Sequence, residues 1–148
     1  MIIPDVNILI HAYDSDFPHH EAARAWWESA LNSQRALGLA WAANLGFIRL
    51  ITNRSIFARP LSVRDAVRIV RLWLAQPRVQ ILIPGEAHGN VVFRLLEEAG
   101  AAGNLTTDAH LAALAIEYGA EIASTDNDFA RFPGLRWFNP LVPRPRRR

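Results

Sequence analysis

Residues 1–12 read MIIPDVNILIHA and pass from one kind of periodicity to another. The β-branched pair Ile2 and Ile3 makes a short apolar run that is typical of a buried strand and ends at Asp5. From Val6 to Ala12 the residues can continue directly as a helix. A buried strand that leads straight into a helix indicates an α/β fold with a parallel sheet.

The rest of the chain repeats this alternation of short apolar runs and helical segments. The patterns predict further strands at 36–39, 79–83, 121–124 and 136–138. They predict helices that start at Asp16-Phe17-Pro18, cover 41–51, follow the capping residues Ser62 and Asp65, carry an apolar stripe over 91–99, and open at Thr107-Asp108. We therefore expect one α/β domain over residues 1–141 and a flexible, Pro/Arg-rich tail over 142–148.

The composition excludes several classes of protein. With 51% hydrophobic residues, the 148-residue chain has enough apolar mass for the core of one domain, and it is not a disordered protein. The absence of cysteine excludes disulfides and thiolate metal sites, and the absence of lysine excludes a Walker-type phosphate loop. No uncharged stretch reaches the roughly 20 residues of a membrane-spanning helix. The N-terminus has no basic signal region, so we expect a cytoplasmic protein without membrane contact.

The net charge of +2 is unevenly distributed. Four arginines lie in the last five residues, and the remaining 12 basic residues face 14 acidic ones. The body of the domain is thus slightly acidic, which does not fit a basic field over the whole protein. Two roles stay open for the arginine tail, binding RNA phosphates or folding back over an acidic cleft.

Three aspartates come at equivalent places in the predicted fold. Asp5 and Asp126 follow apolar strands, and Asp108 stands at the start of a helix. The carboxyl ends of parallel strands and the helix N-termini line one edge of the sheet, so these carboxylates are expected to converge. Like charges in a semi-buried cleft need a cation, and oxygen ligands without cysteine favour Mg²⁺ or Mn²⁺. Each aspartate alone also suits a helix cap or a turn, and that explanation stays open.

The motifs around these aspartates resemble those of a known family. They are Asp5-Val6-Asn7, the segment TDAHLAALA at 107–115 and the segment STDNDF at 124–129. Together, in this order, they are similar to those of the PIN-domain ribonucleases, and within that family to the VapC toxins of type II toxin–antitoxin pairs. The similarity runs from Met1 to about Leu141.

The resemblance implies a three-layer α/β/α sandwich around a central parallel sheet. It implies an endoribonuclease that hydrolyses RNA phosphodiester bonds with Mg²⁺ or Mn²⁺, is neutralised by a cognate antitoxin protein and forms a homodimer. The implied metal ligands are Asp5 and Asp108, supported by Asp126. The implied catalytic residues also include Asp128, and Asn7 and Thr125 would arrange water and carboxylates.

One feature departs from the family. Its members commonly supply a further acidic residue from the helix in the first half, but residues 29–64 contain no Asp or Glu. Asn44 is the nearest polar candidate on that helix, and Gly46 is a candidate for the family position itself. Whether one or two metal ions bind stays open. A catalytically degenerate PIN module that binds RNA or protein is therefore an alternative, as is, less strongly, a phosphohydrolase like the haloacid dehalogenases with Asp5 as nucleophile.

The remaining polar residues give weaker signals. Arg64 and Arg68, with Arg54 and Arg59, are candidates for contacts to an RNA backbone, although a solvated helix face explains them as well. His110 lies about 200° around its helix from Asp108, so the two should not share an ion. The sequence suggests no partner for His88.

Overall fold

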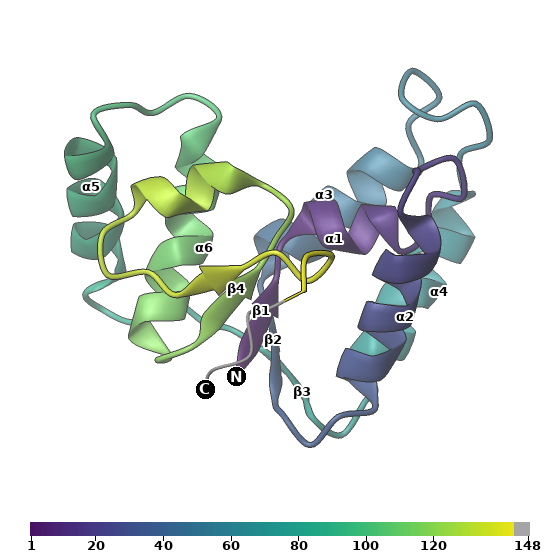
Figure 1. Ribbon diagram of the computed structural model, residues 1–148, viewed down its shortest axis with the longest axis horizontal. Helices are drawn as coiled ribbons and strands as arrows, with labels where there is room; N and C mark the ends of the chain where they lie inside the picture. The colour runs from purple at the N-terminus through teal and green to yellow at the C-terminus, as the bar shows by residue number, and fades with distance from the viewer. Residues whose placement is uncertain (144–148) are drawn as a thin grey trace.

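The computed structural model describes residues 1–143 (Figure 1), so most of the predicted tail, residues 144–148, lies outside the described residues. All strand pairings are parallel and form one five-stranded sheet in the order β3-β2-β1-β4-β5. Its strands are β1 (Ile2–Pro4), β2 (Leu37–Leu39), β3 (Val79–Ile81), β4 (Glu121–Ala123) and β5 (Trp137–Phe138). The first strand of the chain is therefore the central one, and its two neighbours come from distant parts of the sequence.

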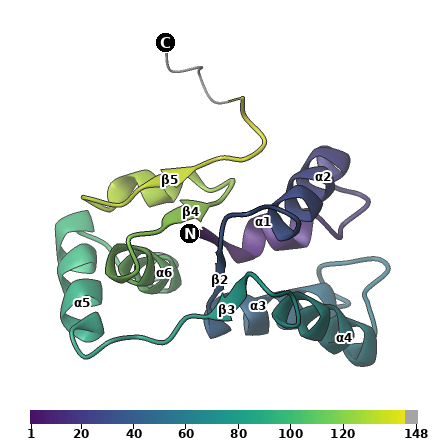
Figure 2. The same cartoon turned by 90° about the horizontal axis from the view of Figure 1, so that it is seen from below.

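The helices cover both faces of this sheet, as expected for parallel strands joined by crossovers. They are α1 (Val6–His11), α2 (His20–Leu31), α3 (Trp41–Ile51), α4 (Val63–Leu74), α5 (His88–Ala99) and α6 (Leu105–Glu117), followed by the 3₁₀ turn η1 (Asn127–Arg131). Figure 2 shows α1 to α4 on one side of the sheet and α5 and α6 on the other. Two apolar cores, one on each side, bury the sheet. The three-layer α/β/α sandwich is confirmed.

Several predictions about where helices begin and end are confirmed. The helix predicted over residues 41–51 is α3. Ser62 caps α4, because its Oγ accepts a hydrogen bond from the backbone N–H of Asp65 and donates one to Asp65 Oδ2. Gly100 ends α5 with φ of +68°, a left-handed conformation that favours glycine.

Three predicted boundaries differ from the structure by two residues or more. Helix α2 begins at His20 rather than at 16–18, because Asp14 makes a turn by accepting from the Asp16 N–H and Phe17 stacks on His11. Helix α6 begins at Leu105, two residues before the predicted start. Strand β3 ends at Ile81, before the predicted Ile83.

The end of β3 has a specific cause. The Tyr118 hydroxyl accepts a hydrogen bond from the Ile83 N–H and donates one to the Ile83 carbonyl, which takes this residue out of the ladder. Tyr118 directly follows α6 and is exposed. In residues 1–143, no helix is both long enough and apolar enough to cross a bilayer.

Candidate active site

The site lies where β1 and β4 leave the sheet. These neighbours pair in register, with Pro4 opposite Ala123, and the Asp5 N–H donates to the Ala123 carbonyl at 2.9 Å. Asp5 and Ser124, the next residues of the two strands, are therefore adjacent although 119 positions separate them. Helix α1 starts from the same edge of the sheet (Figure 1). This arrangement matches the general location of ligand sites in parallel sheets.

Asp5 is held rigidly in a buried position. Only 3% of its surface is exposed. Its Oδ1 accepts from the Val6 N–H at 2.7 Å, which caps α1, and its Oδ2 accepts from Ser124 Oγ at 2.8 Å. Burial raises the pKa of Asp5, and the charge of Asp126 adds to that rise, while the hydrogen bonds from Ser124 and the backbone of Val6 and Asn7 oppose it. The role as a cap and a role in the site are thus compatible.

Ser124 is a site residue that sequence reasoning missed. It is fully buried, and its Oγ both donates to Asp5 Oδ2 and accepts from the Asp126 N–H at 2.9 Å. One hydroxyl thereby ties the first aspartate to the loop that carries the third. The available signal was a polar residue at the end of an otherwise apolar strand, directly before the Thr125-Asp126 pair.

Asp126 and Asp128 form the turn that follows β4. Asp126 Oδ1 accepts from the Asp128 N–H at 2.8 Å and caps η1, as turn chemistry predicts. Asp128 is exposed, with an oxygen 3.9 Å from Arg131 Nη1. Asp126 is half-buried and Asp128 lies at the rim.

Asp108 lies in the first turn of α6 and is half-buried. Burial, followed by the charges of Asp5, Asp126 and Asp128, raises the pKa of Asp108 to about 7. The charges of the other three carboxylates therefore act on Asp108, as is expected for aspartates that lie near one another. In the described residues no arginine or histidine forms an ion pair with Asp5, Asp108 or Asp126.

The donor set fits a hard divalent cation in its chemistry. It consists of carboxylate oxygens that lack a cationic partner, in a place where burial makes their negative charge costly. The side chains do not, however, form a finished cage, because residues 1–143 contain no group of three or more His, Cys, Asp or Glu arranged to hold a metal ion. Each Asp5 oxygen already accepts a hydrogen bond, from the Val6 N–H and from Ser124 Oγ.

Comparison with known proteins identifies the family. The model of the PIN domain family matches residues 2–135. The chain belongs to the PIN domain family. Ribonuclease VapC33 of Mycobacterium tuberculosis (strain ATCC 25618 / H37Rv) is 47% identical over 141 residues, which cover 95% of this chain and 99% of the relative. Ribonuclease VapC37 of the same strain is 41% identical over 140 residues, covering 95% and 97%. The resemblance to VapC ribonucleases is confirmed.

Solved structures agree on the fold. The PIN domain superimposes on a chain of VapBC-1 from nontypeable Haemophilus influenzae with a TM-score of 0.67 at 18% identity, covering 96% of this chain and 100% of that one. The M. tuberculosis toxin VapC20, described as cleaving the sarcin-ricin loop, gives a TM-score of 0.65 at 17% identity and covers 92% and 99%. At these identities the likeness shows the shared fold.

Asn44 and Gly46 lie differently on α3. Asn44 is fully buried, and within residues 1–143 its side-chain amide has no hydrogen-bond partner. Gly46 packs against α1, because a Cβ placed on it would lie 3.2 Å from Cγ2 of Val6, the residue after Asp5. Asn44 as the polar candidate and Gly46 as the family position stay predictions.

The other predicted site residues lie as follows. The backbone amide of Asn7 acts on Asp5, and Thr125 is half-buried beside Ser124. The four predicted RNA-binding arginines are all exposed on α4 and on the connection that leads to it: Arg54, Arg59, Arg64 and Arg68. Two of them form weak ion pairs, Arg59 with Asp16 at 3.8 Å and Arg68 with Asp65 at 3.6 Å. The connection projects from the PIN domain on the side toward which β1 points (Figure 1).

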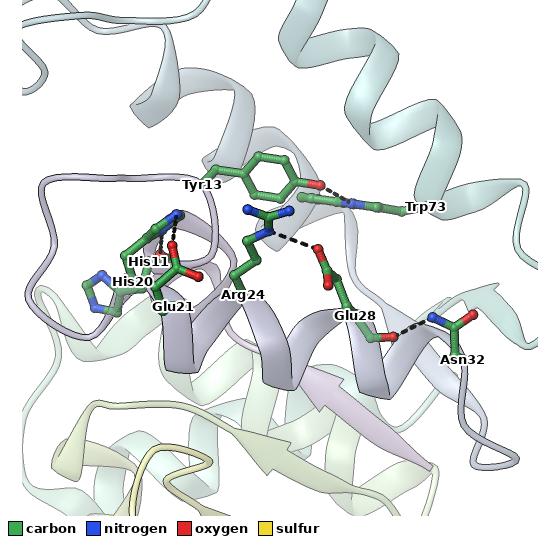
Figure 3. Close-up of polar contacts among 8 residues, drawn as sticks. All are labelled: His11, Tyr13, His20, Glu21, Arg24, Glu28, Asn32 and Trp73. Carbon is green, nitrogen blue, oxygen red and sulfur yellow. Dashed lines mark hydrogen bonds and ion pairs between the residues drawn. The ribbon is translucent and has the colours of Figure 1, made fainter.

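A hollow of about 320 Å³ lies next to α1, between that helix and α2. Its walls include Tyr13, Trp27 and the ion pair of Arg24 Nε with Glu28 Oε1 at 2.9 Å. Figure 3 shows the Tyr13 hydroxyl pointing to Trp73, whose Nε1–H donates to it at 3.1 Å. The rings of Tyr13 and Trp27 thus line the hollow next to the exposed charges of Arg24 and Glu28.

Proposed function

We propose that this PIN domain is a metal-dependent endoribonuclease that hydrolyses RNA phosphodiester bonds with Mg²⁺ or Mn²⁺. The observation that carries the proposal is that the charges of Asp5, Asp126 and Asp128 add to burial in raising the pKa of Asp108 to about 7, while within residues 1–143 no arginine or histidine forms an ion pair with Asp5, Asp108 or Asp126. Relatives named ribonucleases match the chain over nearly its whole length and supply the substrate class.

Asp5 and Asp108 would hold the ion, and Asp126 would support it. Once bound, Mg²⁺ or Mn²⁺ would stabilise charge on the scissile phosphoryl group and help to ionise a water molecule. The hydrogen bonds from Ser124 Oγ and the Val6 N–H fix the rotamer of Asp5. They would therefore hold its carboxylate in one orientation for the ion. Asp128 at the rim, together with Asn7 and Thr125, would orient water and the carboxylates.

The exposed arginines would hold the RNA backbone outside the acidic site. Arg54 and Arg64 are exposed, and no ion pair engages either of them in the part of the chain that the structure describes. Arg59 and Arg68 have long contacts to exposed carboxylates, which are weak and easily exchanged for phosphate.

We expect two protein partners. A cognate antitoxin would neutralise the enzyme, since a chain in the solved VapBC-1 structure has the fold of this chain. A second copy would form a homodimer. It would cover apolar side chains that are exposed, such as Trp41 at 50% and Leu45 at 58%, one turn apart on α3.

The test measures RNA cleavage by antitoxin-free protein with Mg²⁺, with Mn²⁺ and with EDTA. Asp5→Asn and Asp108→Asn should each abolish the metal-dependent cleavage and leave the circular dichroism spectrum unchanged. Glu97→Gln, which changes an exposed carboxylate on α5, is the matched control and should cleave like the wild type. Full cleavage by either site variant would refute the assignment.

A second candidate function is favoured by Gly46. Because this residue leaves α3 without a carboxylate toward the site, a PIN module that binds RNA without cutting it is the alternative. Calorimetry and cleavage assays on the same protein separate the two. RNA binding with no turnover at any metal concentration supports the binding module.

A further inference from the structure

The side chain of His88 connects to α6 at two points. Its Nδ1 lies 2.7 Å from Glu117 Oε2, and its Nε2 lies 2.8 Å from His110 Nδ1. His110 and Glu117 are seven residues apart on α6, about two turns, so they share one face of that helix. One imidazole in the first turn of α5 thereby bridges two turns of its neighbour, and the two helices lie side by side (Figure 2).

One set of tautomers satisfies both contacts. A carboxylate of Glu117 can only accept, so a neutral His88 that donates through Nδ1–H keeps a lone pair at Nε2, and His110 donates to that lone pair through its own Nδ1–H. Glu117 Oε1 also accepts from the Gly85 N–H at 3.3 Å, which ties the loop before α5 to the same carboxylate. The side chains of His88 and Glu117 are only 12% and 16% exposed, so water competes weakly for these bonds.

The N-terminal turn of α6 is anchored in the core by Leu105 but, within residues 1–143, has no side-chain cap. In the described residues its N-cap, Asn104, makes no capping hydrogen bond through its side chain. The segment before it contains two glycines in the left-handed region, Gly100 and Gly103. This turn carries Asp108, whose charge is repelled by those of Asp5 and Asp126. Asp108 can stay close to Asp5 and Asp126 only if the helix that carries it is held in place by other contacts.

We propose that His88 is a positioning residue for Asp108. By bonding His110 and Glu117 together, it fixes the face of α6 opposite the acidic site and holds the first turn against electrostatic repulsion. The inference rests on the proposed nuclease function for its catalytic consequence. The mechanical part, two turns of α6 held at His110 and Glu117 by a residue of α5, stands on the hydrogen bonds alone.

The test compares two replacements of His88. His88→Phe keeps a ring against His110 but makes neither hydrogen bond, whereas His88→Gln retains one donor and one acceptor. We expect His88→Phe to bind Mn²⁺, measured by electron paramagnetic resonance, about tenfold more weakly, with kcat for RNA lowered by a similar factor and KM unchanged. Hydrogen exchange should accelerate at the amides of residues 105–110. His88→Gln should recover all three quantities to within about threefold.

Arg94→Ala is the matched control, because it removes the 3.7 Å ion pair with Glu98 on α5 without touching α6. It should leave exchange, affinity and kcat unchanged. If His88→Phe does not fold, Glu117→Ala takes its place. This variant removes the hydrogen bond between Glu117 and His88 but leaves the His88 side chain unchanged.

The outcomes are distinct. Wild-type values for His88→Phe, in a protein whose wild type binds Mn²⁺ and cleaves RNA, overturn the positioning role and leave the proposed function standing. If the wild type neither binds Mn²⁺ nor cleaves RNA, the proposed function fails. Unchanged exchange at 105–110 in the His88 variant would then overturn the mechanical part as well, and faster exchange would support it.

Discussion

Ser124 Oγ donates a hydrogen bond to Asp5 Oδ2 at 2.8 Å, across 119 positions of sequence. The same oxygen accepts from the Asp126 N–H, so a single buried hydroxyl orients one carboxylate and anchors the loop of another. The contact with Asp5 depends on the pairing of β1 with β4, because only that register brings the ends of the two strands together, whereas the contact with Asp126 is local to the turn. The sheet and the site are therefore coupled through one atom.

Ser124→Ala is expected to weaken both the fold and the site. The change leaves Asp5 Oδ2 and the Asp126 N–H without their partner, and an unsatisfied buried polar group costs about 1–3 kcal/mol in the free energy of unfolding. Urea denaturation measures this loss. Mn²⁺ affinity should also fall, because Asp5 is free to rotate. Ser33→Ala, which removes a hydroxyl bonded to the Ala30 carbonyl at the end of α2, should leave Mn²⁺ affinity as it is.

The raised pKa of Asp108 predicts how stability depends on pH in metal-free protein. Its value of about 7 in the folded state exceeds the ordinary value near 4, so between these values the folded state holds a proton that the unfolded state has lost. Stability from this group is fully present below about pH 4 and is lost as the pH rises to about 7. Asp5, whose pKa is also raised, acts in the same direction.

Urea denaturation in EDTA between pH 4 and 8 measures this dependence. Asp108→Asn should flatten the fall, which for one proton is at most about 1.4 kcal/mol per pH unit and is smaller for a half-buried group. It should also make the protein more stable at pH 8, because the repelling charge is gone. Equal slopes for the variant and the wild type would contradict the electrostatic coupling of the four carboxylates.

Local signals in the sequence predicted much of the fold, and contacts between distant residues explain the rest. The bounds of α3 and the Ser62 cap follow from residues within one or two turns of each other. The start of α6 was wrong because Asn104 gives no side-chain cap for a pattern to detect, a point limited to the described residues. The bridge of His88 to His110 spans 22 residues and depends on how α5 packs, so no periodicity contains it.

The site shows the same division. Three aspartates could be predicted from strand ends and a helix start, because the topology of a parallel sheet fixes where those ends meet. Sequence alone does not show that Asn44 is buried and that Gly46 lies against Val6, since two positions on one helix differ by about 200° and only the packing of α3 on α1 sets which one meets α1. The sequence did not predict Ser124 as a site residue, because its contact with Asp5 exists only through the register of β1 with β4.

The exposed arginines predict a salt-dependent affinity for RNA. Arg64→Ser with Arg68→Ser removes two cations from the outer face of α4, so KM should rise about three- to tenfold while kcat stays constant. The slope of log affinity against log salt should fall by about two. Arg94→Ser on α5, also exposed, is the control and should change neither. An unchanged salt slope in the double variant would assign these arginines to a solvated helix face.

Gly46 predicts that the site can be strengthened by one side chain. Glutamate there would extend from α3 past Val6 toward Asp5 and add the carboxylate that this chain lacks. The backbone of a helix gains about 1 kcal/mol when an interior glycine is replaced, but the new Cβ at 3.2 Å from Val6 Cγ2 requires that side chain to give way. Gly46→Gln has the same shape and the same steric cost without the charge. The difference between the two variants therefore isolates the carboxylate.

We expect Gly46→Glu to bind Mn²⁺ about tenfold more tightly than Gly46→Gln, because an additional anionic oxygen joins the ligands. It should also be less stable than Gly46→Gln in EDTA at pH 8, where a fifth negative charge adds to the repulsion. Equal Mn²⁺ affinities would mean that position 46 does not reach the ion, and the site would then consist of the carboxylates of β1, α6 and the β4 turn alone.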